Sequence, residues 1–368
     1  MATEMRIDQA IARQNQLLPG VSRTFALTIP QLAEPLNIAV TNAYLLCRIA
    51  DTIEDDPGLS IEQKQTFHQQ FIEIVDDKIT PEQFIQDLVP LLSEKTSKAE
   101  RNLIAETDLV IQVTHSLNDK QRAALTRCVR IMCSGMPTFQ RVNTAGGLNK
   151  MTDMDRYCYY VAGVVGEMLT ELFCDYSEAM NENYKELMDL SISFGQGLQM
   201  TNILKDVWDD RQVNACWLPQ EIFEQYDLKL DQLSPNLDTD SLANDGFAEG
   251  MSELVGIARA HLENALKYTR YIPKSETGIR RFCLWAIGMA VLTLRNIHNN
   301  PEFLSGQDVK ISRRKVKATV ALTSMFCRSN RALGMLFNIA EQGLPKEHEV
   351  NLHHHKTNLG RCEDLVIE

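Results

Sequence analysis

Apolar residues recur every three to four positions along most of the chain, which is the period of amphipathic and buried α-helices. Strand-like alternation bounded by turn signals is almost absent, and the breaks in the pattern fall at proline and glycine. The pattern predicts helices over residues 36–55, 60–76, 81–92, 98–115, 119–134, 153–176, 184–210, 219–224, 246–271, 276–299 and 312–341. The sequence therefore predicts an all-α protein.

We find neither an internal repeat nor a low-complexity linker, so we expect one helical domain over residues 1–344. A polar C-terminal tail, 345–368, is expected to be flexible; its three adjacent histidines, His353 to His355, cannot share one helix face. The longest uncharged apolar run, 282–294, is shorter than the roughly 18 residues needed to cross a bilayer. It predicts a buried helix rather than a transmembrane anchor.

Charge and cysteine content limit which kinds of partner the protein is expected to bind and which cellular compartment it is expected to occupy. The net charge of −12 argues against nucleic acid or an anionic membrane as the main partner, although metal ions and local cations would still allow an anionic substrate. The nine cysteines include no C-x-x-C pair, which indicates reduced thiols rather than a zinc site or disulfide framework. The N-terminal ten residues are too polar for a signal peptide, so we expect a cytoplasmic protein.

Acidic residues gather where the predicted helix 36–55 must end, just before Pro57. Asp51 and Asp55 are four residues apart and share one face of the helix, about 6 Å apart along its axis. Carboxylates at a helix C-terminus repel one another and oppose the helix dipole. A solvated acidic helix end is one interpretation, and a Mg²⁺ site is the other, because Mg²⁺ prefers a few carboxylates together with phosphate and water oxygens.

The same spacing returns at the end of the predicted helix 184–210, in Asp206 and Asp210. Gln199 and Asn202 extend this polar stripe backwards among apolar neighbours, where polar groups need partners. Two such stripes favour a pocket with a polar mouth and an apolar body. The predicted metal ligands are Asp51, Asp55, Asp206 and Asp210, with Glu54 and Asp209 as secondary candidates.

Five segments together resemble the squalene/phytoene synthase family. They are Ser22-Arg-Thr-Phe-Ala26, Asp51-Thr-Ile-Glu-Asp-Asp56, Tyr157-Cys-Tyr-Tyr-Val-Ala-Gly-Val-Val-Gly166, Asn202-Ile-Leu-Lys-Asp-Val-Trp-Asp-Asp210 and Trp217-Leu-Pro219. The resemblance covers roughly residues 20–330. It implies the isoprenoid synthase fold, a single-domain helical bundle around a central apolar cavity that accepts farnesyl diphosphate.

The resemblance also implies roles for individual residues. The four aspartates of the metal set act in catalysis by holding Mg²⁺ against the departing diphosphate, and Tyr160 transfers a proton; from the residues alone, Tyr160 reads as a core tyrosine. The implied substrate-binding residues are Arg23, Phe25, Tyr44, Arg48, Gln199, Asn202, Lys205 and Phe282.

A basic segment, Val309-Lys-Ile-Ser-Arg-Arg-Lys315, resembles one in the reductive members of the family, the squalene synthases. A solvated basic face is the plainer interpretation, and a clamp for dinucleotide phosphates is the sharper one. Ser312 stands where the family usually has arginine. The resemblance implies NADPH, or NADH as the alternative donor, bound by Arg23, Arg48, Asn202, Lys205, Lys310, Ser312, Arg313 and Arg314.

The implied reaction joins two farnesyl diphosphates head to head through presqualene diphosphate and then reduces the product to squalene. Two alternatives stay open: a non-reductive member that makes dehydrosqualene, presqualene diphosphate or phytoene, and a catalytically inactive helical scaffold. Because squalene is a hydrocarbon, we also expect peripheral contact with a membrane, through an apolar surface that the sequence does not identify.

Overall fold

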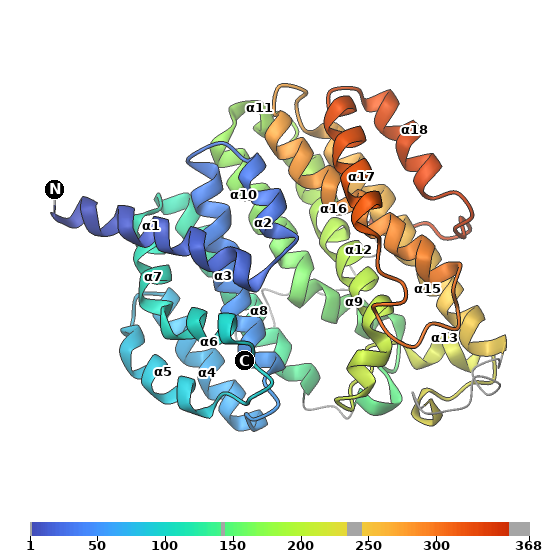
Figure 1. Ribbon diagram of the computed structural model, residues 1–368, viewed down its shortest axis with the longest axis horizontal. Coiled ribbons are helices and arrows are strands. Elements are labelled where there is room, and N and C mark those ends of the chain that lie inside the picture. Colours follow the sequence, from blue (N-terminus) through green and yellow to red (C-terminus); the bar gives the residue numbers. More distant parts are fainter. Residues whose placement is uncertain (1, 141–143, 234–244, 353–368) are drawn as a thin grey trace. The chain divides into compact units, whose positions relative to one another are not determined.

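The computed structural model describes residues 2–140, 144–233 and 245–352, and these fold into helices (Figure 1). Within those ranges there is no β-strand, only an isolated bridge between Leu148 and Pro219. The all-α prediction is confirmed. The chain divides into two compact units, Met1–Arg141 with Met168–Glu182 and Val142–Glu167 with Asn183–Glu368. The prediction of one domain over residues 1–344 stays a prediction.

The first unit is built from short and medium helices around one buried helix, α3. Its helices are α1 Ala2–Val21, α2 Phe25–Thr28, α3 Leu36–Asp55, α4 Ile61–Val75, α5 Pro81–Leu88, α6 Lys98–Ala105, α7 Thr107–Ser116, α8 Asp119–Gln140, most of α10 Val164–Tyr176, and α11 Glu178–Asn181. Short 3₁₀ turns, η1 Ile29–Gln31 and η2 Val89–Leu91, follow α2 and α5.

The helices of the second unit range from five to 28 residues and include the two longest in the described ranges. They are α9 Met151–Cys158, α12 Tyr184–Arg211, α13 Gln220–Glu224, α15 Asp245–Tyr271, α16 Thr277–His298, α17 Arg313–Phe326 and α18 Asn330–Ala340, with 3₁₀ turns η3 Thr144–Gly146 and η5 Leu230–Gln232. A π-helical turn, η4 Tyr159–Gly163, joins α9 to α10.

Three predicted helices are interrupted. The segment 98–115 breaks at Glu106, the segment 153–176 contains the π-turn, and the segment 312–341 stops between α17 and α18. At this last break Ser329 caps α18 by accepting a hydrogen bond from the Ala332 N–H at 3.3 Å. Helix α1 was not predicted, because its buried face is narrow and includes the polar residue Gln14.

α3 is the centre of the first unit and packs against α1, α4, α6, α7 and α8. Its Asn42 is fully buried, donates to the Val110 carbonyl at 2.8 Å and accepts from the Thr114 hydroxyl at 2.8 Å. Gln14 of α1 completes this network by accepting from the Asn42 amide at 3.3 Å. Because the buried amide is satisfied, α3 is held in one register, and with it the acidic residues at its end.

In the second unit, α12 approaches the π-turn and the start of α10 at backbone contact distance. A Cβ added at Gly195 would lie 2.1 Å from the Ala162 carbonyl oxygen, and one added at Gly166 would lie 2.2 Å from that of Ser191. Only glycine permits this approach. The glycines thus fix the turn that carries Tyr159 and Tyr160 against α12.

By length and composition α16 could cross a membrane, with a mean hydropathy of 1.3 over its most apolar stretch, of which 56% is buried. Its Arg280 is fully buried and donates to the carbonyl oxygens of Thr269 at 2.9 Å and of Ile272 and Cys327 at 2.5 Å. Such contacts are those of a core helix packed inside a protein.

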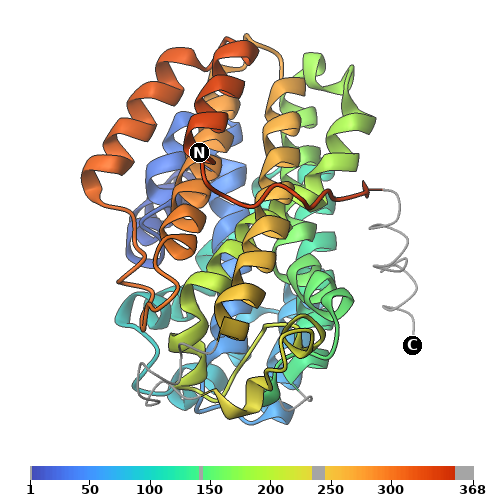
Figure 2. The same cartoon turned by 90° about the vertical axis from the view of Figure 1, so that its right-hand side faces the viewer.

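The predicted tail is partly described by the structure, over residues 345–352. Here Arg259 of α15 donates to the His348 carbonyl at 3.1 Å, and Figure 2 shows this segment, in red, crossing α15. The same guanidinium pairs with Glu341 at 3.3 Å. His353 to His355 lie outside the described residues.

His68 ties α4 to α3 one residue before Asp51. Its imidazole is buried, and Nε2 donates to the Ala50 carbonyl at 3.1 Å. Burial lowers the pKa of His68 to about 4. The unfolded chain therefore takes up this proton first as the pH falls, so the stability that neutral His68 contributes is lost between about pH 6.5 and pH 4.

We therefore expect His68→Gln to weaken the acid sensitivity of folding. Over pH 6.5 to 4, the wild type should lose up to about 3 kcal/mol more unfolding free energy than the variant. Urea denaturation at a series of pH values measures this difference, with His115→Gln, at a more exposed histidine, as the control. Parallel pH profiles for the wild type and His68→Gln would contradict the prediction.

Candidate acidic site in each unit

The C-terminal end of α3 combines carboxylates with one arginine. Arg48 lies 3.9 Å from Asp51, and its guanidinium also donates to the Tyr44 hydroxyl at 3.1 Å. Burial opposes the charge on Arg48, but Asp51, Tyr44 and Asp55 together raise the pKa of the guanidinium. Arg48 therefore stays cationic beside the acidic residues.

Aromatic rings continue this stripe towards the start of α3. The ring centroids of Phe25 and Tyr44 are 4.7 Å apart, and the Tyr44 hydroxyl donates to the Val21 carbonyl at 3.2 Å. The Arg48 guanidinium lies 5.8 Å from the centroid of the Tyr44 ring. Arg23, two residues before Phe25, is exposed. The first unit thus places Phe25, Tyr44 and Arg48 in one contiguous stripe.

The carboxylates at this end are held close to one another in poor solvation. Burial raises the pKa of Asp51, although Arg48 lowers it in part. Burial, Asp55 and Asp51 raise the pKa of Glu54 well above its ordinary value. Burial and the Asp51 charge also raise the pKa of Asp55 to about 7, although the residue reaches solvent. The folded chain therefore disfavours these negative charges unless a cation joins them.

One carboxylate oxygen of this group has no hydrogen-bond donor in the folded chain. Asp51 Oδ1 is buried and accepts no hydrogen bond, and such an oxygen is costly unless a ligand satisfies it. Among the described residues, no three His, Cys, Asp or Glu side chains converge as a complete metal cage. Mg²⁺ needs no such cage, because it keeps several waters and takes further oxygens from phosphate. The carboxylates of Asp51 and Asp55 therefore fit Mg²⁺ as part of its set of oxygen ligands.

The sequence did not indicate that Asp56 differs in role from its acidic neighbours, or that Lys64 lies beside them. Asp56 accepts hydrogen bonds from the Gly58 N–H at 2.7 Å, the Ser93 N–H at 2.9 Å and the Thr96 hydroxyl. Burial opposes the charge on Asp56, but these hydrogen bonds lower its pKa. The same bonds hold the loop after α3 in place. Lys64 of α4 donates to the Glu54 carbonyl and adds a positive charge beside the acidic residues. A lysine on the next helix gives no motif signal in the sequence.

The second unit repeats the arrangement at the end of α12. Lys205 Nζ lies 3.0 Å from Asp206 Oδ2. Burial raises the pKa of Asp206, Lys205 lowers it, and Asp209 raises it again. Asp210 and Gln199 are half-buried on the same helix, whereas Asn202 and Asp209 are exposed. The predicted residues of this stripe therefore share one end of α12.

A loop between α16 and α17 covers part of this acidic end. The Gly306 N–H donates to Asp209 Oδ2 at 3.4 Å. A Cβ added at Gly306 would lie 2.6 Å from Asp206 Oδ1 and 3.1 Å from Asp209 Oδ2. Gly306 thus donates to the Asp209 carboxylate and lies close against that of Asp206, a position that no sequence motif indicated.

Tyr160 lies in the π-turn and is buried, with its ring 5.7 Å from that of Tyr159 in an edge-on arrangement. The Tyr159 hydroxyl donates to Glu167 at 3.1 Å, which orients the turn. π-turns inside helices are frequent at functional sites. Asp155, just before the turn, was missed by sequence reasoning, and burial raises its pKa to about 7. Phe282 is buried on α16.

The basic segment forms the start of α17. Ser312 caps the helix by accepting from the Lys315 N–H at 3.3 Å, which gives a physical role to the serine that replaces the family's usual arginine. Arg313 and Arg314 follow in the first turn and are exposed, and Lys310 bonds to Gln307 at 3.3 Å. Cations at the positive end of a helix are unfavourable unless an anion neutralises them.

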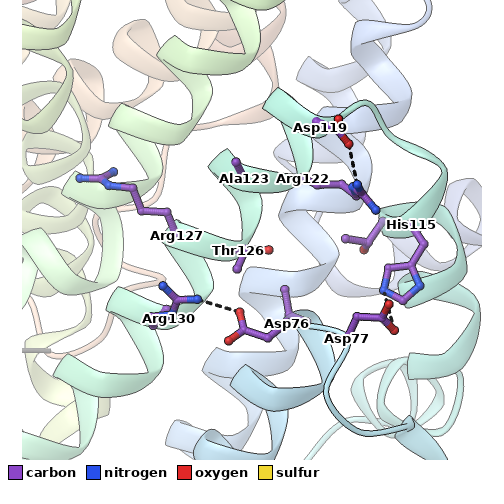
Figure 3. Close-up of a pocket in the computed structure, with 11 residues that line it drawn as sticks. Asp76, Asp77, His115, Asp119, Arg122, Ala123, Thr126, Arg127 and Arg130 are labelled. Carbon is purple, nitrogen blue, oxygen red and sulfur yellow. Dashed lines mark hydrogen bonds and ion pairs between the residues drawn. The ribbon is translucent and has the colours of Figure 1, made fainter. Parts of the chain in front are cut away.

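The first unit also has a charged pocket of about 480 Å³ away from the acidic motif, between the end of α4, the end of α7 and α8 (Figure 3). Asp76 pairs with Arg130 at 2.8 Å, and Asp119 pairs with Arg122 at 2.6 Å. The Asp76–Arg130 ion pair joins the end of α4 to α8, and the Asp119–Arg122 pair lies within α8. We therefore interpret this pocket as part of the packing between these helices. It is not the apolar cavity that the resemblance implies, and that cavity stays a prediction.

The predicted site residues thus form two sets. Arg23, Phe25, Tyr44, Arg48, Asp51, Glu54 and Asp55 belong to the first unit, and Tyr160, Gln199, Asn202, Lys205, Asp206, Asp209, Asp210, Phe282, Lys310, Ser312, Arg313 and Arg314 belong to the second. Their assignment to one shared site stays a prediction.

Residues 18–315 match the family model described as squalene/phytoene synthase. The chain belongs to the squalene/phytoene synthase family. Its curated relatives include squalene synthase ERG9 of Gibberella zeae, 32% identical over 79% of this chain and 59% of the relative, and squalene synthase clz20 of Cochliobolus lunatus, 30% identical over 81% and 68%. The squalene synthase of Schizosaccharomyces pombe is 29% identical over 80% of this chain and 61% of its own. The match thus spans about three fifths to two thirds of these relatives.

Solved structures agree with the family assignment at the level of the fold. A complex of TcSQS with a ligand has a TM-score of 0.72 at 21% identity and covers 97% of this chain and 98% of its own. A dehydrosqualene synthase with a ligand has a TM-score of 0.61 at 18% identity and covers 89% and 99%. The isoprenoid synthase fold implied by the resemblance is confirmed.

The contact at Gly306 gives a specific prediction for the family site. Gly306→Ala should push the carboxylates of Asp206 and Asp209 away from the loop, because the added methyl lies within contact distance of both. We expect weaker Mg²⁺ activation, on the order of tenfold, with the melting temperature little changed.

Titration of turnover with Mg²⁺ measures the effect, and Gly146→Ala, whose Cβ would meet only Asp231 at 3.8 Å, is the matched control. Equal Mg²⁺ dependence in both variants would show that the loop does not position the carboxylates.

Proposed function

We propose that this chain is a squalene synthase, which condenses two farnesyl diphosphates through presqualene diphosphate and reduces the product to squalene. The observation that carries the proposal is the repeated helix end, in which a carboxylate lies beside a cation: Asp51 with Arg48 at 3.9 Å and Asp206 with Lys205 at 3.0 Å. The squalene synthases among its relatives, at about 30% identity, support the reaction class.

Mg²⁺ bound by Asp51, Asp55, Asp206 and Asp210 would supply the positive charge that a departing diphosphate needs. The chain's own residues have complementary tasks. Arg48 and Lys205 lie beside the carboxylates and would contact the phosphate oxygens that the metal leaves free. Glu54 and Asp209 would serve as secondary ligands. Phe25 and Tyr44 would hold the allylic chain and face a developing carbocation with their rings.

Tyr160 would move the proton that is lost when the two chains join. It belongs to a turn whose backbone packs closely against α12 at Gly195, which would limit movement of the backbone that carries the ring. Phe282, buried on α16, would contribute an apolar wall that excludes water from the cation.

NADPH would supply the hydride of the reductive step. The start of α17 suits its phosphates, because Arg313 and Arg314 add positive charge where the helix dipole is also positive. Lys310 and the Ser312 cap complete this end, and Arg23, Arg48, Asn202 and Lys205 are the further predicted contacts. We place the protein in the cytoplasm, with peripheral membrane contact for release of the hydrocarbon.

In the presence of Mg²⁺, we expect purified protein to convert farnesyl diphosphate to squalene only when NADPH is also present. Without NADPH, presqualene diphosphate or a non-reduced hydrocarbon should accumulate. Gas chromatography with mass spectrometry identifies the products. The same non-reduced hydrocarbon with and without NADPH would instead make the chain a dehydrosqualene or phytoene synthase, and no product under any condition would favour the inactive scaffold.

Asp51→Asn and Asp206→Asn should each lower turnover by about a hundredfold or more, because each removes a charge that the leaving group requires. Both variants should stay folded in circular dichroism, since the carboxylates are poorly solvated in the metal-free protein and their charge does not stabilise it. Asp87→Asn, at an exposed aspartate of α5, is the control. Full activity of both variants would overturn the metal assignment.

A further inference from the structure

The outer faces of α17 and α18 are apolar where a soluble helix is normally polar. Both helices pack on α16 through buried residues, Thr323 on α17 and Leu333 and Phe337 on α18. On their solvent-exposed sides the exposed fractions are 43% for Leu322, 73% for Met325, 37% for Phe326, 61% for Met335 and 64% for Ile339.

These residues follow the helical period, so they form stripes rather than scattered positions. Arg314, Ala318, Leu322 and Met325 recur at intervals of three and four along α17, and Met335 and Ile339 are four apart on α18. The two helices contact one another, and Figure 2 shows them as neighbouring orange-red and red helices. We call the five apolar residues Leu322, Met325, Phe326, Met335 and Ile339 the outer apolar face.

The segment that carries this face has charges of one sign only. Residues 309–340 contain no aspartate or glutamate, although the whole chain has a net charge of −12. Within this segment the cations are all exposed: Lys310, Arg313, Arg314, Lys315, Lys317, Arg328 and Arg331. Arg328 lies in the turn between the two helices, two residues after Phe326, and Arg331 lies in the first turn of α18, four residues before Met335.

We propose that the outer apolar face of α17 and α18 binds the surface of an anionic lipid bilayer. Long apolar side chains flanked by Lys and Arg are the composition of helices that lie in a membrane interface, where the chains enter the acyl region and the cations meet lipid phosphates. A second copy of the chain fits less well, because two identical basic faces would repel each other.

The surface differs from the cofactor end of α17. Lys310 to Arg314 lie at the start of the helix, whereas the outer apolar face begins at Leu322, about two turns beyond Arg314, and continues onto α18. The face thus identifies where the hydrocarbon-releasing contact of the proposed function would occur. It stands on exposure and charge alone, so its failure and that of the enzymatic proposal can be told apart by measuring lipid binding without substrate.

The test is co-sedimentation of the full chain with vesicles of phosphatidylcholine alone or mixed with phosphatidylglycerol. We expect binding to the mixed vesicles and little to phosphatidylcholine. The triple variant Met325→Gln, Met335→Gln, Ile339→Gln should lower the partition coefficient at least about tenfold, because it removes the inserted apolar groups. Arg328→Gln with Arg331→Gln should lower binding to the mixed vesicles by about tenfold.

Matched controls use similar residues on the first unit. Ile79→Gln with Leu91→Gln changes two apolar residues of 40% and 42% exposure, and Lys95→Gln with Lys98→Gln changes two exposed cations near Glu94 and Glu100. Because all the substituted side chains are exposed, every variant should keep the wild-type melting temperature.

Three outcomes would overturn the proposal. They are absence of binding to the mixed vesicles, equal loss of binding in the controls and the face variants, and a dimer that becomes a monomer in the triple variant while neither protein binds lipid. Selective loss of lipid binding in the two face variants, with turnover on soluble substrate unchanged, would support it.

Discussion

Like charges at the C-terminal end of a helix repel each other and oppose its dipole, and both units of this protein hold such charges in place. The buried amide of Asn42 fixes α3 in register, so Asp51 cannot turn away from Asp55 without breaking satisfied hydrogen bonds. Gly195 and Gly166 fix α12 against the π-turn in the same way. The free energy that keeps the carboxylates together thus comes from packing elsewhere in each unit, and a bound magnesium diphosphate would release the repulsion.

The neighbours of these carboxylates determine which of them can bind a metal. Asp56 belongs to the same sequence motif as Asp51, but its two oxygens already accept hydrogen bonds from Gly58, Ser93 and Thr96. Asp51 keeps one oxygen buried without a donor. The two carboxylates therefore differ in what they can bind. That of Asp56 is occupied in holding the loop after α3, whereas that of Asp51 has an oxygen that a cation would satisfy.

Periodicity predicted the helices well where one face is continuously apolar, and α3 has the predicted bounds. It failed where the chain keeps the period but the backbone changes course. The π-turn at Tyr159–Gly163 lies where α12 approaches closely, and the break before Asn330 is followed by a serine cap. The acidic residues of the site could be predicted because spacing along one helix determines their face. Lys64 and Gly306 could not, since each reaches the carboxylates from another element of its unit.

The net charge of the whole chain does not describe the charge of each part of its surface. A charge of −12 argues against an anionic membrane as the main partner, yet residues 309–340 carry cations only. Electrostatic attraction falls off within about 8 Å at physiological salt, so a lipid surface responds to the nearest charges rather than to the total. The acidic remainder of the chain would instead favour one orientation, with α17 and α18 towards the bilayer. A basic segment that starts as a cofactor clamp and continues as a lipid-facing helix pair would then join the reductive step to the surface where a hydrocarbon can leave.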